Sequence, residues 1–401
     1  MKMHKSKKYY LLFTRIVMIL TAASFVLTGC QKNIDEPQTP DAIGLSADFS
    51  NHVKQKQGFL QTNLVANNTK YPGARIDPVL LNAWGLAFSP GGVAWIGAQA
   101  GHVSTVYNSE GVQLRPAVAI PSPGGATGGN PTGVVFNGST TDFALPAPNS
   151  KPALFLFVGV DGILSGWNGS AGNTALLIKN NVATSAYTGL AIASNNGANF
   201  LYAANFRAGR IDVWDKDFNV IPMPFHDRHL PAGYSPFNIQ KLGDALFVMY
   251  AKVGPDGRSK AGRGNGFVDI YNTNGSFIKR FVSQGQLDAP WGVAKAPSTF
   301  FGDGDDDSDD KGKDKDENNK RSTILIGNFG NGHINAYRSD GKFIGELATH
   351  KSPIVIDELW AISFVPSTAT ALDSNRLYFT AGPDEEADGL FGYIKKKIEI
   401  E

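Results

Sequence analysis

Short apolar runs recur along the chain, and turn-forming residues separate them in the same order in six successive segments. Each segment opens with a short apolar strand that starts at a small or aromatic residue, and a second, more hydrophobic strand follows. The first strands start at Trp84, Thr132, Thr188, Phe237, Trp291 and Trp360, and the second strands span 93–98, 153–160, 199–204, 245–251, 322–327 and 376–381. This alternation of short strands and turns predicts an all-β fold without long helices.

The second half of each segment is also shared. A Gly is followed four to six places later by an aromatic residue, as in Gly101…Tyr107 and Gly389…Tyr393. Most segments then enter an Asn/Asp/Gly turn and a weaker fourth strand, such as 277–282 or 342–347. Four strands repeated every roughly 50–65 residues are typical of propeller blades. We therefore predict a six-bladed β-propeller of four-stranded antiparallel blades over residues 58–397.

The ring must also close, because each blade buries both faces only against its neighbours. The sixth segment ends after its third strand, at Tyr393, whereas 58–66 (GFLQTNLVA) has strand character and no segment of its own. We expect 58–66 to supply the outermost strand of blade six and so to remove an open sheet edge.

The N-terminus has the pattern of an export signal. A cationic stretch precedes the apolar run from Ile16 to Leu27, which is too short for a comfortable membrane span. Leu27-Thr28-Gly29-Cys30 then matches the bacterial lipobox, so we predict a signal peptide over 1–29, a lipidated Cys30 and a flexible tether over 30–57. Gln31, where inner-membrane retention would need Asp, favours an outer-membrane location, on the periplasmic or the surface side.

The net charge and the cysteine count limit the classes of partner that we expect for the chain. The chain has 37 basic and 36 acidic residues, a net charge of +1, so no global field indicates nucleic acid as a partner. With a single Cys, no intramolecular disulfide forms. We expect a monomer whose partners are the membrane, through its lipid, and a carbohydrate, peptide or envelope-protein ligand.

Eight stretches of the chain have distinctive motifs. They are QTNLVAN (61–67), LNAWGLAFSP (81–90), NPTGVVFN (130–137), DGILSGWN (161–168), 230–251, LDAPWGVAKAP (287–297), LIGNFGNGHINAY (325–337) and 377–392. In these stretches the chain resembles a family of exported bacterial propeller proteins found in genomes with PEP-CTERM/exosortase systems. The resemblance implies a six-bladed ring similar to NHL-type propellers, and it supplies no catalytic residues. An acidic insertion over 301–321 departs from the family pattern.

Propeller geometry indicates where a binding site would lie. Residues just before each first strand, and residues in the turn between second and third strands, converge on one face around the central opening. These funnel-face candidates are Asn82, Trp84, Asn130, Trp291, Glu358 and Trp360 from the first set and Gln99, Asp161, Asn205, Asn328 and Asp384 from the second. They suit a small polar or carbohydrate-like ligand, although capping of strand ends and packing between blades also explain such residues.

Two further segments carry candidate chemistry. His226 and His229, in the loop before the fourth segment, have possible metal-binding or acid–base capacity, but solvation of a surface loop is the favoured explanation. The acidic run over 301–320 fails the EF-hand pattern, since Ser308 and Asp314 stand where that loop needs Gly and Glu. It is typical of a charged insertion.

The sequence contains no HExxH, GxSxG or CxxC motif, so no catalytic residue is assigned and a binding scaffold without enzymatic activity is favoured. No cofactor is predicted for that function. The alternative is an enzyme like metal-dependent lactonases or quinoprotein sugar dehydrogenases, in which Glu358, Asn130, Asn205 and Asp384 would hold Ca²⁺. A third hypothesis is a structural subunit of an outer-membrane complex.

Overall fold

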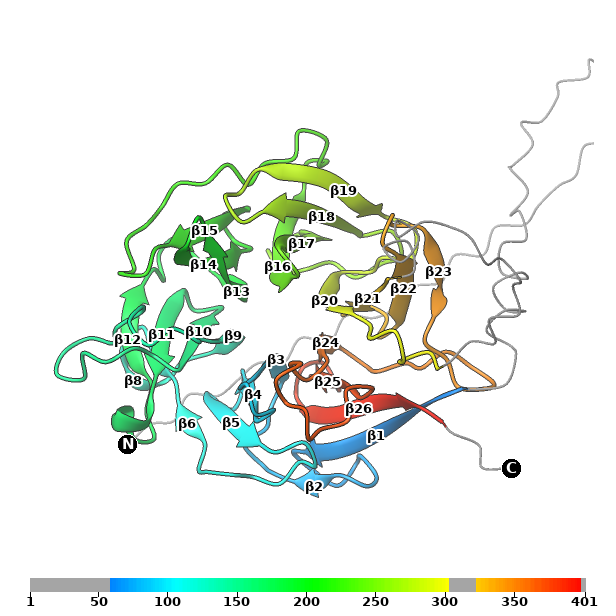
Figure 1. Cartoon of the computed structure of the whole chain (residues 1–401), viewed down its shortest axis with the longest axis horizontal. Helices are drawn as coiled ribbons and strands as arrows, with labels where there is room; N and C mark the ends of the chain where they lie inside the picture. Colours follow the sequence, from blue (N-terminus) through cyan, green and yellow to red (C-terminus); the bar gives the residue numbers. More distant parts are fainter. Residues whose placement is uncertain (1–57, 303–321, 398–401) are drawn as a thin grey trace, which may run out of the picture. The chain divides into compact units, whose positions relative to one another are not determined.

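The computed structural model describes residues 58–302 and 322–397. These residues form strands β1 to β26 and one short 3-10 helix, Gly169–Ala171. Six antiparallel sheets lie around a central axis, with their strands stacked from the axis outward (Figure 1). The all-β class and the six-bladed β-propeller expected from the sequence are confirmed.

The blades follow one another along the chain. Blades 1 to 3 contain β3 (Ala83–Phe88), β4 (Ala94–Ala98), β5 (Val103–Tyr107), β6 (Val118–Ala119), β9 (Pro131–Phe136), β10 (Phe155–Gly159), β11 (Ile163–Trp167), β12 (Leu176–Asn180), β13 (Tyr187–Asn195), β14 (Ala198–Asn205) and β15 (Arg210–Trp214). Blades 4 to 6 contain β16 (Tyr234–Leu242), β17 (Ala245–Lys252), β18 (Gly266–Asn272), β19 (Phe277–Ser283), β20 (Pro290–Lys295), β21 (Thr323–Asn328), β22 (Ile334–Arg338), β23 (Phe343–Glu346), β24 (Leu359–Ser363), β25 (Leu377–Ala381) and β26 (Leu390–Lys396). A hairpin that the sequence pattern did not predict, β7 (Pro121–Ser122) and β8 (Gly125–Gly128), joins blades 1 and 2.

Blade 3 differs from the expected four strands. Its sheet contains only β13, β14 and β15, and a single bridge between Trp214 and Val220 occupies the position of the fourth strand. Pro222 and Pro224 follow closely, and proline has no backbone N–H to donate to a ladder. A longer outer strand therefore cannot form here.

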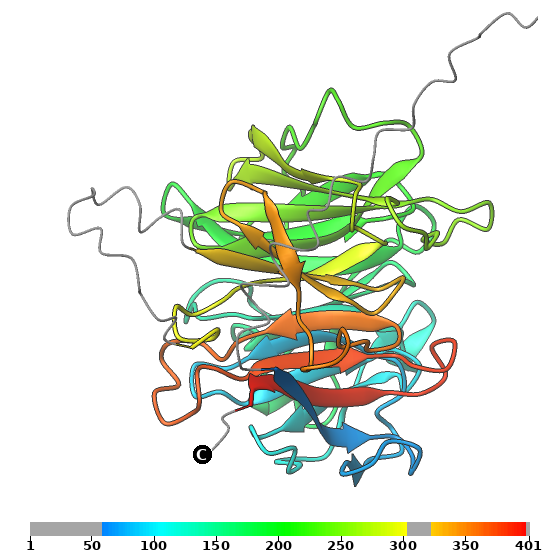
Figure 2. The ribbon, with the colours of Figure 1, turned by 90° about the vertical axis from the view of Figure 1, so that its right-hand side faces the viewer.

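The N-terminal strand closes the ring. β1 (Phe59–Ala66) pairs antiparallel with β26, in a register that runs from Phe59 opposite Lys396 to Ala66 opposite Leu390. Figures 1 and 2 both show this blue strand beside the red one, and β2 (Arg75–Ile76) then adds outside β1. The predicted closure of blade six by 58–66 is confirmed.

Glycine lets the innermost strands of neighbouring blades approach closely. A Cβ added at Gly85 would lie 2.1 Å from the carbonyl oxygen of Thr132, and one at Gly189 would lie 2.0 Å from Oδ1 of Asn238. The Gly that follows the opening residue of most first strands is thus a packing requirement. Blade 4 has Asn238 in this position, and its amide donates to the carbonyl of Trp291 at 2.8 Å.

The core is divided between adjacent blades. One cluster, for example, combines Leu156 and Leu164 of blade 2 with Leu190 and Leu201 of blade 3. Since every sheet buries both faces in this way, each blade depends on its two neighbours. That dependence is the physical reason for a closed ring.

Several sequence-based predictions fall outside the described residues. These are the signal peptide over 1–29, the tether over 30–57 with Cys30, and residues 303–321 of the acidic insertion. Within 58–302 and 322–397, no helix has the length and apolar character needed to cross a membrane.

Candidate functional site

Polar side chains from three blades meet at the face where the innermost strands begin. Asn82, Asn130 and Glu358 stand immediately before β3, β9 and β24. Gln99 and Asp161 lie in the turns between second and third strands, which return to the same face. We call this face the mouth of the ring.

A chain of hydrogen bonds links these side chains across blades 2, 1 and 6. Asp161 accepts from the backbone N–H of Asn130 at 3.0 Å, and Asn130 accepts from the amide of Gln99 at 3.3 Å. The amide of Asn82 donates to Gln99 at 3.0 Å and to Glu386 at 2.8 Å. The backbone N–H of Glu386 donates in turn to Glu358 at 2.5 Å. These six residues form what we call the mouth network, and five of them were predicted from the sequence.

An unusual backbone turn brings Glu386 into this network. Asp384, Glu385 and Glu386 have φ values of 64°, 58° and 64°, so three consecutive non-glycine residues are left-handed. Left-handed helical conformation costs an L-residue about 1–2 kcal/mol. Strained backbone of this kind concentrates at functional sites, so the turn makes Glu386 a candidate functional residue.

Aromatic rings close the axis beneath the network. The rings of Trp84 and Trp360 stack with centroids 3.6 Å apart, and Phe329 stacks on the other side of Trp360 at 4.1 Å. Trp291 and Phe237 contact Trp360 at 5.9 and 5.8 Å. We call these five residues the aromatic plug. Phe329 is half-buried and the other four are buried, so three predicted tryptophans serve as the floor of the mouth.

Burial changes the ionisation of two mouth carboxyls. Burial, together with repulsion from Glu386, Asp357 and Glu385, raises the pKa of Glu358 to about 7. Burial also raises the pKa of Asp161, although backbone N–H groups oppose the shift. Oδ1 of Asp161 and Nε1 of Trp84 are buried and have no hydrogen-bond partner among the described residues. Such atoms are rare in folded proteins and call for an explanation.

Three predicted residues are engaged elsewhere. The amide of Asn205 donates to Ser185 and to Asp212 within blade 3, and its Oδ1 accepts two backbone N–H groups. The amide of Asn328 donates to the carbonyl of Gln286 and to Asn331 within blade 5. The third, Asp384, is exposed. Its carboxylate lies 2.6 Å from Nζ of Lys70, in the segment after β1.

His226 and His229 are both exposed on the loop before β16. Between them, Asp227 is buried, and its carboxylate pairs with Arg280 of blade 4. Arg280 also pairs with Asp269, whose pKa burial raises to about 7. The charged cluster in this loop therefore fastens the loop to blade 4.

The described residues contain no group of three or more His, Cys, Asp or Glu side chains placed to hold a metal ion. Of the four residues considered for Ca²⁺, Glu358 and Asn130 belong to the mouth network, whereas Asn205 and Asp384 have the separate partners given above. The four side chains therefore do not act as one ligand set in this arrangement.

The sequence did not indicate two residues of the mouth, Glu386 and Arg258. Glu386 lies two places beyond Asp384, and only the left-handed turn shows which carboxylate enters the network. Arg258, in the loop between β17 and β18, places Nη2 3.6 Å from Glu386 and so reaches from blade 4 to blade 6. Its Asp256-Gly257 turn signals a hairpin, but nothing in the sequence indicates that the hairpin extends toward the mouth.

The ring and its mouth define the class of the protein as a six-bladed β-propeller. No family model matches the chain. Two proteins of Acanthamoeba polyphaga mimivirus, the uncharacterized proteins R648 and L690, are each 30% identical to it. The matches cover 83% of this chain and 80% of R648, and 84% of this chain and 86% of L690. The chain belongs to the same family as these viral proteins, and they lend no support to the bacterial family that the sequence resembles.

Two solved structures are similar to the chain at low sequence identity. Virginiamycin B lyase from Staphylococcus aureus is 13% identical, with a TM-score of 0.42 over 85% of this chain and 99% of that one. A streptogramin B lyase is 13% identical, with a TM-score of 0.45 over 85% of this chain and 98% of that one. Likenesses at this level carry no argument about activity.

Proposed function

We propose that the protein is a recognition scaffold that binds a small polar, carbohydrate-like ligand at the mouth of the ring. The observation that carries the proposal is the left-handed turn at 384–386, which holds Glu386 against Asn82 despite its conformational cost. Among the described residues, three consecutive left-handed non-glycine residues occur only at this turn.

The chemistry of the mouth supports a ligand with several hydroxyl or amide groups. Carboxylates accept and side-chain amides both donate and accept, so the mouth network offers both kinds of partner. Asp161 is half-buried, so its carboxylate is an acceptor at the mouth that a ligand hydroxyl can approach. Half-buried Phe329 adds an apolar ring surface beside these groups.

A ligand screen with matched variants tests the proposal. A ligand that binds only the folded chain raises its thermal midpoint, by an amount that grows with ligand concentration. We expect a sugar or glycan fragment to do so with the wild type and with Glu385→Gln, and the shift to disappear with Glu386→Gln. Glu385 is the control because it shares the turn and the charge but is exposed and outside the network. Failure of every polar ligand, or equal shifts with both variants, would contradict the proposal.

We further propose that the scaffold is exported and is anchored through Cys30 to the outer membrane of the cell envelope. Support comes from the cationic and apolar stretches before Leu27-Thr28-Gly29-Cys30. In a Gram-negative host, a fatty-acid label is expected in the wild-type chain and not in Cys30→Ala. Label retained by Cys30→Ala would overturn the anchor.

Glu358 favours a second candidate, an enzyme that uses the same mouth. A carboxyl with a pKa near 7 is suited to general acid–base chemistry at neutral pH. The discriminating measurement is turnover of the ligand found in the screen. Conversion by the wild type that is lost in Glu358→Gln, with binding retained, would establish catalysis, and binding without conversion would establish the scaffold.

A further inference from the structure

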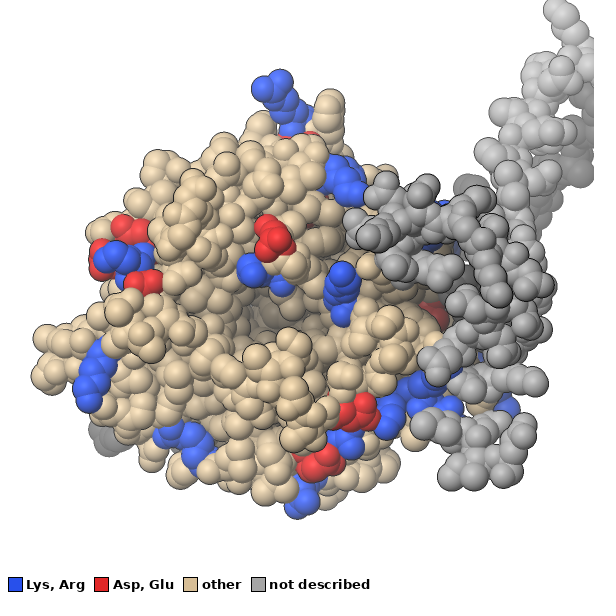
Figure 3. Space-filling view, in the orientation of Figure 1, with Lys and Arg blue, Asp and Glu red and all other residues tan. Residues whose placement is uncertain are grey.

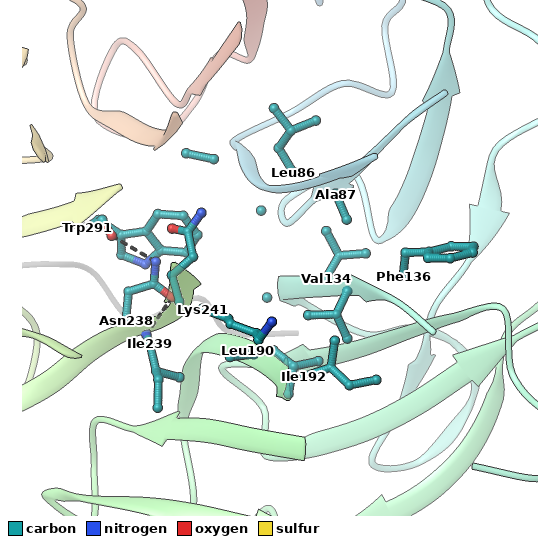
Figure 4. Close-up of a pocket in the computed structure, with 16 residues that line it drawn as sticks. Leu86, Ala87, Val134, Phe136, Leu190, Ile192, Asn238, Ile239, Lys241 and Trp291 are labelled. Carbon is teal, nitrogen blue, oxygen red and sulfur yellow. Dashed lines mark hydrogen bonds between the residues drawn. The ribbon is translucent and has the colours of Figure 1, made fainter. Parts of the chain in front are cut away.

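The axis of the ring contains a cavity of about 190 Å³ on the other side of the aromatic plug. Its wall comes from the innermost strands of all six blades, β3, β9, β13, β16, β20 and β24. In Figure 4, Leu86, Val134, Leu190 and Ile192 surround one space. The cavity therefore differs from the mouth in both position and polarity.

The cavity is closed at one end and reached from the other. Its inner end is lined by Trp291 of the aromatic plug and by Ala361, which belongs to the same hydrophobic cluster. Lys241 lies one residue before the end of β16 and is exposed, so the opening is on the face where the first strands end. A space-filling view shows a hollow at the centre of the ring, with basic side chains and an acidic side chain beside it (Figure 3).

The charge of the lining has one sign. Lys241 is the one charged residue among the sixteen that line the cavity. Neither an ion pair nor a hydrogen bond occupies its ammonium group within the part of the chain that the structure describes. Beside it, Gln240 accepts a long hydrogen bond from the N–H of Val293 at 3.4 Å, and its amide N–H₂ remains available there as a donor. Two donors thus stand at the rim of a chamber whose wall contains both apolar side chains, such as Leu86 and Leu190, and the polar side chain of Asn238.

We infer that this cavity binds a small organic carboxylate with an apolar body. The carboxylate lies at Lys241 and Gln240, and the body packs against Leu86, Leu190 and Ile192. Hydrogen bonds between an ammonium and a carboxylate are among the strong ones. Without an acidic residue in the lining, a cationic ligand has no partner here.

The volume limits the size of the ligand. A dry apolar cavity of about 150 Å³ holds benzene, whereas sites for drug-sized ligands start near 300 Å³. A chamber of about 190 Å³ therefore has room for one ring or one short alkyl chain. This site is separate from the mouth, so either site can be wrong without affecting the other.

Calorimetric titration of the purified full-length chain with sodium hexanoate, and with 1-hexanol as the uncharged analogue, tests the inference. We expect hexanoate to bind with 1:1 stoichiometry and at least tenfold more tightly than hexanol. Lys241→Gln is expected to lower hexanoate affinity about tenfold and to leave hexanol unchanged. The matched control is Lys295→Gln, which removes an exposed charge at the end of β20, outside this cavity.

A second variant tests the location. Ala87 is half-buried in the lining, and Ala87→Phe fills space there. Binding of both probes should be lost while the circular dichroism spectrum stays that of the wild type. No saturable binding of hexanoate to the wild type, or undiminished binding to Lys241→Gln, would overturn the inference and leave an axis filled by water alone.

Discussion

Nε1 of Trp360 donates a hydrogen bond to Oδ1 of Asn82 at 2.8 Å. The two residues are 278 positions apart and belong to blade 6 and blade 1, the pair of blades that meets at the closure of the ring. Asn82 is fully buried and has a φ of 44°. It therefore links the closure, the aromatic plug and the mouth network through one side chain.

Asn82→Gly is expected to lower the free energy of unfolding by about 1–3 kcal/mol, the cost of leaving a buried donor such as Nε1 of Trp360 unpaired. Glycine tolerates the left-handed backbone, so this variant isolates the side-chain bonds. Asn82→Ala should cost more, because alanine also has to adopt a φ of 44°. Urea denaturation measures both. Wild-type stability in Asn82→Gly would contradict the assigned role.

Asp388 holds the segment that follows the ring-closing strand β1 through several hydrogen bonds. Its carboxylate accepts hydrogen bonds from Asn67 at 3.0 Å, Asn68 at 2.6 Å, Lys70 at 3.0 Å and Tyr71 at 2.8 Å, all in the segment after β1. Asp388→Ala should therefore increase amide hydrogen exchange over 59–66 at least tenfold, with little change in β16–β19. Asp384→Ala is the control, since Asp384 also pairs with Lys70 but is exposed. Equal hydrogen exchange in the two variants would contradict the role of Asp388 in holding the N-terminal segment.

The carboxyl of Asp388 also predicts that the fold loses stability at low pH. Burial opposes ionisation of Asp388, but the hydrogen bonds outweigh it and hold its pKa below the usual range. A depressed pKa stabilises the fold above the pKa of the unfolded chain, and that stability is lost as pH falls through the folded value. Below about pH 4, the stability of the wild type should therefore approach that of Asp388→Asn. A constant gap between them from pH 7 to pH 3 would exclude this linkage.

Glu358 predicts the opposite pH dependence. Because its folded pKa is raised to about 7, the folded chain binds the proton more tightly than the unfolded chain. Stability from this group is present at low pH and is lost as pH rises from the unfolded pKa through 7. Glu358→Gln should thus gain about 1 kcal/mol relative to the wild type between pH 5 and 8, a figure kept low because water screens a half-exposed carboxyl. Urea titrations at several pH values measure the gain. A gain that does not depend on pH would contradict the raised pKa.

Gly189 tests the packing of the innermost strands. A Cβ at this position would lie 2.0 Å from Oδ1 of Asn238, so Gly189→Ala should destabilise the chain by about 1–3 kcal/mol through overpacking. Gly91→Ala is the matched control, because nothing lies within 4 Å of a Cβ there. Thermal unfolding compares the two variants. Equal midpoints would mean that the inner strands can move apart at little cost.

The sequence was sufficient to predict the architecture and most residues of the mouth network. Repeated strands and the strand character around Leu64 predicted the ring and its closure, because hydrophobic periodicity reports local structure and burial. Asn82, Gln99 and Glu358 were found because their repeat positions fix the face on which they lie. Glu386 and Arg258 were missed, since their positions depend on loop conformations and on contacts between distant blades. The repeat predicted a fourth strand in blade 3, but the sheet has only three. Pro222 and Pro224 prevent the fourth strand from extending, and this local effect is not visible in the repeat pattern.

The most direct test of the account is a crystal structure of the chain with the polar ligand that raises its thermal midpoint most. The account predicts ligand hydroxyls within hydrogen-bond distance of Asp161 and Glu386, with one face of the ligand against Phe329. A ligand bound on the outer rim of a blade, with the mouth network untouched, would contradict it.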